Sequence, residues 1–232
     1  LHSITLPPDL TVLVLAPHPD DFDAIAVTLQ HFNAGGHSVH LTVTRTGSGV
    51  EDTFCSPPTW DTKAAIREQE QRQSCRLFGL PSSNITFLRL QMDAALHQIE
   101  NAHNTALISK QIHRVKPHII CLPHGNDTNT GHQRMYRMCC HALQKGQEPA
   151  TLFLNKDPKT VAMRTDLYTP FDKKTASWKA TLLRAHASQQ QRNLNTRGQG
   201  FDERVLMQNR KTAEELSLKT DFAEAFELQF LP

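Results

Sequence analysis

Residues 11–21 read TVLVLAPHPDD, and this stretch decides the predicted fold of the 232-residue chain. Residues 11–15 form a continuous apolar run rich in valine, which is typical of a strand buried on both faces of a parallel sheet. Apolar residues at positions 22, 25, 26, 29 and 32 then recur at helical spacing. They predict a helix over 21–34 that ends at the Gly-Gly pair that follows.

Strands and helices go on alternating as far as residue 143. The apolar patterns predict strands over 38–44, 85–88 and 118–122, helices over 61–78, 101–115 and 133–143, and polar loops over 45–60 and 123–131. This alternation is typical of βαβ units. It predicts an α/β fold, a Rossmann-like three-layer sandwich with a mostly parallel sheet.

The pattern changes after residue 148. It predicts two strands, 151–154 and 160–164, joined by a turn at 155–159, then a helix over 172–189, a polar loop over 193–200 and a late strand over 227–231. Residues 213–225 give no clear pattern. Neither a linker nor an internal repeat is visible, so we predict one domain over residues 1–232.

Composition narrows the class of protein. The chain has 25 basic and 23 acidic residues, a net charge of +2 that gives no reason to expect nucleic acid or acidic membranes as partners. No apolar run approaches the roughly 20 residues that span a bilayer, and no signal peptide is visible. Five cysteines without a CxxC spacing predict reduced thiols and a cytoplasmic protein. The oligomeric state is open, with a homo-oligomer among the possibilities.

Two polar clusters follow predicted strands of the sheet. His18, Asp20 and Asp21 come after the first strand, and the loop from His124 to His132 comes after strand 118–122. Ligands bind at the carboxyl ends of parallel strands, so the two clusters are expected to meet. Imidazole and carboxylate are zinc ligands in sites that keep a position for water, and a second carboxylate can act as base. The pattern predicts a metal-dependent hydrolase.

A structural alternative exists for the two aspartates. Asp is among the best helix N-caps, and either Asp20 or Asp21 stands at the predicted start of a helix. A cap at one position is compatible with a ligand at its neighbour.

Four segments carry a resemblance to a known family. LVLAPHPDD at 13–21 resembles the first signature of the LmbE-like (PIG-L) family of zinc-dependent de-N-acetylases, and the loop ending at His132 resembles the second. REQE at 67–70 with LFGL at 77–80, and LLRAHASQ at 182–189, resemble two weaker family segments. The matches span about residues 11–190 in the family's order.

The resemblance implies roles for four residues. His18, Asp21 and His132 would hold the metal, Zn²⁺ or another divalent transition metal, and Asp20 would be the general base. The implied substrate is a small N-acylated amino sugar or a conjugate of one, which loses its N-acetyl group. The implied fold is Rossmann-like, in agreement with the alternation of strands and helices.

The chain departs from the family pattern near both signatures. Phe22 replaces an acidic residue and becomes a candidate substrate contact, while Gly131 replaces the acidic residue often found before the ligand histidine. Asn129 stands where a histidine is usual; it can donate a hydrogen bond to an oxyanion but cannot carry a proton. Asp127 is a candidate for that proton transfer.

Further candidates would line the substrate cleft. Arg67 can bind a hydroxyl or an anion through its forked donors, or it is a solvated helix charge paired with Glu68 or Glu70. His186 is a candidate substrate contact or a packed histidine. Residues 45, 46 and 48 can also face the cleft, and the run 189–193 is either a solvated loop or a segment that closes over a polar substrate.

Two other functions compete with the hydrolase. The departures at positions 22, 129 and 131 also fit a catalytically weak metal- or sugar-binding protein of the same fold. A nucleotide-binding Rossmann domain is disfavoured, because no GxGxxG follows the first strand.

Overall fold

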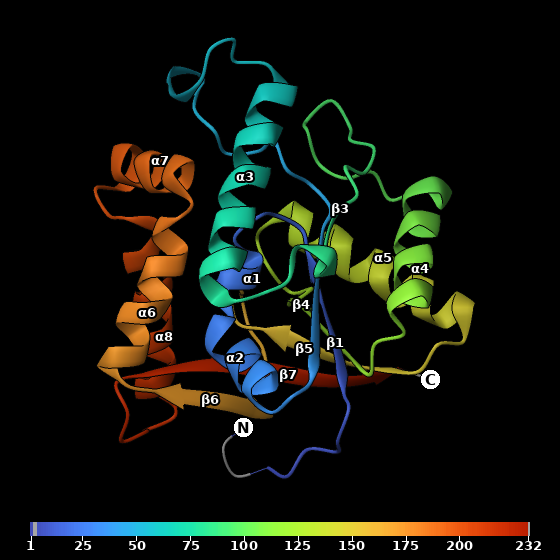
Figure 1. Cartoon of the computed structure of the whole chain (residues 1–232), viewed down its shortest axis with the longest axis vertical. Helices are drawn as coiled ribbons and strands as arrows, with labels where there is room; N and C mark the ends of the chain where they lie inside the picture. The colour runs from blue at the N-terminus through green and yellow to red at the C-terminus, as the bar shows by residue number, and fades with distance from the viewer. Residues whose placement is uncertain (2–3, 232) are drawn as a thin grey trace.

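The computed structural model describes residues 1 and 4–231, and the strands of this part form one sheet in the order β3-β2-β1-β4-β5-β7-β6. Figure 1 shows the sheet running through the molecule. The strands are β1 (Thr11–Ala16), β2 (Ser38–Val43), β3 (Ile85–Phe87), β4 (Ile119–Pro123), β5 (Ala150–Asn155), β6 (Leu167–Phe171) and β7 (Phe222–Leu231). Neighbouring strands from β3 to β5 are parallel, whereas β7 is antiparallel to both β5 and β6. The predicted mostly parallel sheet is confirmed.

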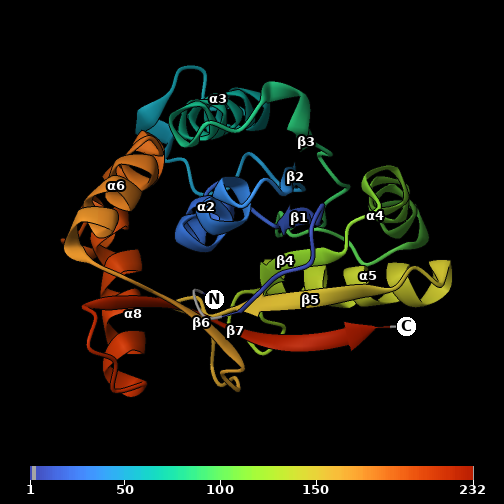
Figure 2. The same ribbon diagram turned by 60° about the horizontal axis from the view of Figure 1, so that its bottom comes forward.

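Helices cover both faces of the sheet. They are α1 (Asp21–Ala24), α2 (Ala26–Ala34), α3 (Trp60–Phe78), α4 (Ala102–Val115), α5 (Thr130–Gly146), α6 (Lys173–Arg184), α7 (Ala187–Arg197) and α8 (Phe201–Glu215), with short 3₁₀ turns at Asp52–Phe54 and Ser82–Asn84. Figure 2 shows α2 and α3 on one side and α4 and α5 on the other. In the described part of the chain, no helix combines the length and apolar character needed to cross a bilayer.

The side chains of β1 divide between two cores. Val12, Val14 and Ala16 pack in one apolar cluster with residues of α2 and α3. Leu13 and Leu15 pack in the other, with residues of α4 and α5. The strand is therefore buried on both faces, as its unbroken apolar run predicts, and the three-layer arrangement is confirmed.

The helix predicted over 21–34 is interrupted at Ile25. The carbonyl of Ala24, at the end of α1, accepts a hydrogen bond from Lys179 Nζ at 2.6 Å. At the start of α2, the carboxylate of Glu224 accepts from the backbone N–H groups of Val27 and Thr28 at 3.0 and 2.8 Å. Side chains from α6 and β7 thus satisfy the backbone groups that the break leaves open.

The C-terminal third differs most from the prediction. Residues 160–164 do not form a strand; Thr160 makes only an isolated bridge with Asp127, and the strand is β6, further on. The predicted helix 172–189 is divided into α6 and α7, and the predicted loop 193–200 is largely the second half of α7. α8 was not predicted, and β7 begins at Phe222 rather than at residue 227.

Candidate metal centre and active site

The loop after β1 carries His18, Asp20 and Asp21 to the carboxyl end of the parallel strands. Asp20 has a φ of 112°, in the left-handed region that costs a non-glycine residue on the order of 1–3 kcal/mol. Its backbone N–H donates to Gln71 Oε1 at 3.0 Å, and the N–H of His18 donates to Asp21 Oδ2 at 2.7 Å. The surrounding side chains therefore hold the turn in its strained form.

Neither Asp20 nor Asp21 caps helix α1 with its side chain. Asp20 occupies the N-cap position of α1, but its side chain makes no capping hydrogen bond. Its Oδ2 instead accepts from Arg67 Nη2 at 2.8 Å. Asp21 Oδ2 accepts from His18 N, and its Oδ1 lies 3.7 Å from His132 Nε2. Both carboxylates face side chains of the site.

The loop after β4 supplies the second part of the site, because β4 lies beside β1 in the sheet. His132 is in the first turn of α5, and its Nδ1 lies 3.0 Å from Asp127 Oδ2. The other oxygen of Asp127 accepts from the backbone N–H of Asn129 at 2.6 Å. Because the Asp127 carboxylate can only accept, it favours the His132 tautomer with the proton on Nδ1. The lone pair of Nε2, which faces Asp21, is then available to a metal ion.

The three predicted metal ligands converge in the structure. One ligand atom each from His18, Asp21 and His132 lies within 4.8 Å of the other two. A Cβ at position 131 would lie 3.2 Å from two atoms of the His18 ring, so Gly131 leaves that ring its space. Two imidazole nitrogens and one carboxylate oxygen are a donor set for zinc and similar divalent ions, and this set fits such an ion.

Charge at the centre also favours a cation. Burial lowers the pKa of His18 well below its usual range, and the neighbouring His132 acts in the same direction. Burial raises the pKa of the Asp21 carboxyl. Burial alone would lower the pKa of His132 too, but the hydrogen bond to Asp127 and the charge of Asp21 outweigh it and raise the pKa to about 9. The carboxylates on either side of His132 thus attract positive charge, which a divalent ion also supplies.

A cavity of about 320 Å³ opens above these residues. Its lining is mainly polar and contains His18, Asp20, Asp21, Arg45, Ser48, Gly49, Arg67, His97, Asn129, His132, Asp157, Lys159, Gln189, Arg192, Asn193, Arg197 and Arg204. The predicted cleft residues Arg45 and Ser48 are among them, whereas Thr46 is buried and does not line the cavity. Residues of the run 189–193 also line it, although on a helix and not on a loop.

Three of the predicted site residues lie outside this lining. Phe22 is fully buried and packs edge-on against Phe78, so the substrate contact predicted for it does not fit its position in the core. His186 is fully buried as well, with Nε2 2.6 Å from Asp23 Oδ2, which corresponds to the alternative of a packed histidine. Asp127 lies behind His132, 2% exposed, where it orients that ring and does not reach a substrate.

Helix α3 connects the separate sequence segments. Arg67 donates to Asp20, to the carbonyl of Ser48 at 2.7 Å and to the carbonyl of Pro19. It is therefore not the solvated charge of the alternative interpretation. Glu70 accepts from both the backbone N–H and the hydroxyl of Ser188 at 2.7 Å, which joins α7 to α3. The weaker family segments thus form one hydrogen-bonded frame around the strained loop.

Five ionisable side chains of the lining were not predicted from the sequence. They are His97, Asp157, Lys159, Arg197 and Arg204. They lie on loops after β3 and β5, at the end of α7 and on α8. The high density of arginine and amide side chains over 189–204 was the available signal, but the absence of apolar periodicity there favoured a loop.

Comparison with protein-family models gives one match. The model of the GlcNAc-PI de-N-acetylase family, PIG-L, matches residues 13–143, more than half of the chain. The chain belongs to this family. The match covers the loop with His18 and Asp21, helix α3 and the loop with His132. A search of curated protein sequences gives no significant match.

Several solved structures share the fold. N,N'-diacetylchitobiose deacetylase from Pyrococcus horikoshii has a TM-score of 0.77 at 16% identity, over 96% of this chain and 84% of that one. The zinc-inhibited form of a teicoplanin deacetylase has 0.67 at 13%, over 95% and 98%. The 4-carboxy-2-hydroxymuconate hydratase of Pseudomonas putida has 0.70 at 15%, over 96% and 97%. At these identities the likeness concerns the fold, which serves a hydratase as well as deacetylases.

Proposed function

We propose that this PIG-L family protein is a metal-dependent hydrolase that removes an N-acyl group, foremost N-acetyl, from an amino sugar or a sugar conjugate. One observation carries the proposal: His18, Asp21 and His132 converge at the base of a polar cavity with the carboxylate of Asp20 beside them. The family description and the deacetylases among the similar structures support the N-acetyl substrate class. Zn²⁺ is the proposed metal, although the same donors accept other divalent ions.

Asp20 is the proposed general base. A divalent metal held by the three ligands would polarise the amide carbonyl and lower the pKa of water. Asp20 then accepts the proton of the attacking water. Burial raises the pKa of Asp20, and the charge of Arg67 opposes that shift. The carboxylate is therefore a better base than an exposed aspartate, while Arg67 keeps it oriented.

Asn129 is the proposed hydrogen-bond donor to the developing oxyanion. Its Oδ1 already accepts from Gly131 N at 2.9 Å, which leaves the Nδ2 group, at the cavity lining, as a donor. An amide cannot protonate the leaving nitrogen, and Asp127 is engaged behind His132. We therefore assign the return of the proton to the leaving amine to Asp20, and a positioning role to Asp127.

The cellular setting is part of the same proposal. All five cysteines are free, which supports the reducing, cytoplasmic location predicted from their spacing. One domain over the whole chain and a possible homo-oligomer stay predictions.

A protein that binds metal or sugar without turnover is the second candidate. The position of Asn129 favours it, because an imidazole there would give the site a second proton carrier and the amide does not. The two candidates agree on the metal ligands and differ on whether Asp20 transfers a proton.

The substitution Asp20→Asn tests the base, and hydrolysis by the unmodified protein separates the two candidates. We expect the variant to keep its metal, because Asp20 is not among the ligands, and to release acetate from N-acetyl amino sugars at least about 10²-fold more slowly. Asp9→Asn, at an exposed aspartate, is the matched control. Undiminished acetate release in Asp20→Asn would remove the base assignment. Full metal content in the unmodified protein without hydrolysis of any N-acetyl sugar would favour the binding protein.

A further inference from the structure

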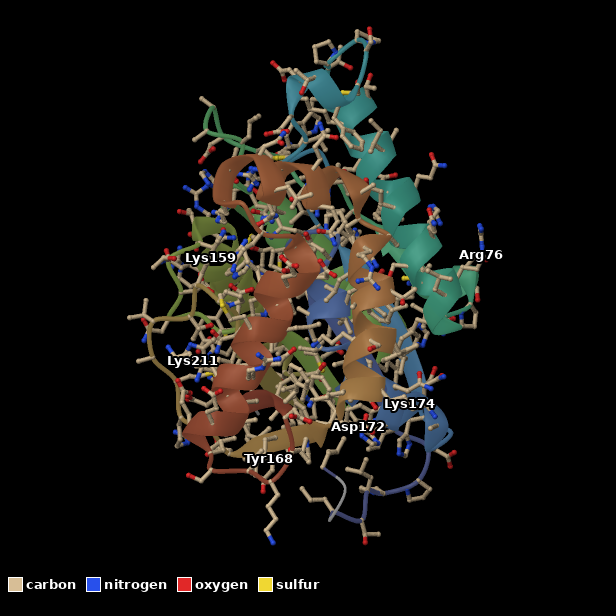
Figure 3. The ribbon with its side chains drawn as sticks, turned by 90° about the vertical axis from the view of Figure 1, so that its left-hand side faces the viewer. Arg76, Lys159, Tyr168, Asp172, Lys174 and Lys211 are labelled. Carbon is tan, nitrogen blue, oxygen red and sulfur yellow. The ribbon has the colours of Figure 1, made fainter. Side chains whose placement is uncertain are left out.

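Five cationic side chains line the cavity without an ion-pair partner. They are Arg45 after β2, Lys159 after β5, Arg192 and Arg197 on α7, and Arg204 on α8. In the described residues, none of them has a carboxylate oxygen within 4.0 Å, while Arg67, Arg89, Arg134, Arg137, Arg164 and Arg184 each have one at 2.5–2.8 Å. Five cations without a carboxylate partner therefore share this one cavity. Figure 3 shows Lys159 beside α8, on the side away from α3.

The carboxylates of the same cavity are already engaged. Asp20 accepts from Arg67, and Asp21 accepts from the backbone of His18 and faces His132. Asp157 Oδ1 accepts from the backbone N–H of Lys159 at 2.9 Å. Three carboxylates thus share the cavity with six cationic side chains, Arg67 included, so positive side chains are in excess.

Arg45 is the most deeply placed of them. Only 8% of the residue is exposed, and its Nε is buried without a hydrogen-bond partner. Among the described residues, its guanidinium has one hydrogen-bond contact, between Nη1 and Nε2 of His18 at 3.5 Å. A buried, unpaired guanidinium is costly, so a compensating anion is to be expected at this point of the cavity.

A hydrogen bond between α7 and the loop after β2 places Arg192 near Arg45. Gln189 Nε2 donates to the carbonyl of Gly49 at 2.9 Å and so fixes α7 against the loop that begins with Arg45. Gly49 has a φ of 81°, and a Cβ there would lie 2.9 Å from Arg192 Nη1. The glycine allows the guanidinium to approach the loop closely. On α8, Arg204 Nη1 donates to Asn193 Oδ1 at 2.8 Å, which orients a further cation.

We propose that this cation cluster, Arg45, Lys159, Arg192, Arg197 and Arg204, binds an anionic group, phosphate or carboxylate, that belongs to the substrate. Guanidinium groups recognise both anions through paired hydrogen bonds. The cluster and the candidate metal ligands line one cavity of about 320 Å³, so a single small molecule can contact both parts. The substrate is then an N-acylated amino compound that carries a phosphate or carboxylate near the acylated nitrogen. That the anion belongs to a substrate rests on the proposed function, whereas the binding of an anion by the cluster does not.

Anion binding tests the site without any turnover. The dissociation constants of inorganic phosphate and of malonate are measured by calorimetry on the full chain and on Arg192→Ala and Arg204→Ala. We expect each substitution to weaken binding roughly 10- to 100-fold, the range for a lost charge-assisted hydrogen bond. Arg76→Ala is the matched control, since Arg76 is exposed on α3, at the opposite side of the view in Figure 3. The tighter of the two probes identifies the anion, and affinities that neither substitution changes would overturn the proposal.

Hydrolysis tests the link to the substrate. The kcat/KM of an N-acetyl amino sugar is compared with that of the same sugar bearing a phosphate ester or a carboxylate. We expect the anionic compound to be preferred at least about tenfold, and Arg192→Ala to reduce that ratio where Arg76→Ala does not. Equal kcat/KM for neutral and anionic compounds would overturn this inference and leave the hydrolase standing. Phosphate binding that depends on Arg192, without hydrolysis of any compound, would support the anion site and contradict the proposed function.

Discussion

The His132 ring is oriented by a hydrogen bond to Asp127. Asp127 holds its Nδ1 and leaves Nε2 towards Asp21, so the metal affinity of the centre should depend on a side chain that cannot touch the ion. We expect Asp127→Asn to weaken metal binding about 10- to 100-fold, as measured by competition with a chromogenic chelator. Asp166→Asn, at an aspartate paired with Arg164 on the surface, should leave the affinity unchanged. Equal affinity in Asp127→Asn would show that His132 needs no such partner.

Asn129 combines a structural and a chemical role, and two substitutions separate them. Its Oδ1 caps α5, while Nδ2 is the proposed oxyanion donor. Asn129→Asp keeps a capping oxygen and removes the donor, whereas Asn129→Ala removes both. We expect both variants to lower kcat about 10²-fold or more, and only the alanine variant to lose about 1 kcal/mol of stability. An aspartate variant with unchanged kcat would contradict the donor role.

For single residues, the sequence could predict the position of side chains that directly follow a strand of the sheet, and few others. His18, Asp20, Asp21 and His132 come together because neighbouring parallel strands end at one edge, a consequence of topology alone. Phe22 follows Asp21 directly, but one step along the helix turns its side chain into the core. The positions of such side chains depend on packing partners that lie far away in the sequence.

Among the helices, α7 shows why polar elements escape prediction. Its sequence has no apolar face, and it is held by polar contacts such as Ser188 with Glu70 and Gln189 with Gly49. These partners lie more than 100 residues earlier in the chain. Apolar periodicity predicts a helix that packs against a core, but it does not predict a helix that is held by hydrogen bonds.

The break between α1 and α2 depends on one buried ion pair. Lys179 contacts Glu224 at 2.7 Å, and both are almost fully buried. Lys179→Met leaves the carboxylate of Glu224 buried without its partner, so we expect a loss of about 3–5 kcal/mol in the free energy of unfolding. Adding Glu224→Gln removes the unpaired charge but keeps only one of the two acceptor oxygens used by Val27 and Thr28, so it should recover part of the loss. Denaturant titration measures both, with Lys173→Met at an exposed, loosely paired lysine as control.

No recovery in the double variant would mean that packing of the Lys179 stem, and not the unpaired charge, sets the stability of this region. A loss as large in Lys173→Met would likewise contradict the assignment to burial.

Over the whole molecule, the first two thirds were predictable and the last third was not. From β1 to β4 each apolar strand is followed by a helix, so the parallel half of the sheet follows from local patterns. β6 and β7 add antiparallel strands at one edge, and α7 and α8 bring arginines back over the cavity. That return is decided by contacts between segments far apart in the chain. The family match ends at residue 143, so it does not cover these segments.

Acetate release measured together with bound metal is the sharpest test of the proposed metal centre. The protein is stripped with a chelator and titrated with Zn²⁺, and metal content and hydrolysis of an N-acetyl amino sugar are followed on the same samples. We predict that activity rises with bound metal to one ion per chain, and that Asp21→Ala neither retains the ion nor hydrolyses the sugar. Hydrolysis that survives both chelation and Asp21→Ala would contradict a metal centre built by His18, Asp21 and His132.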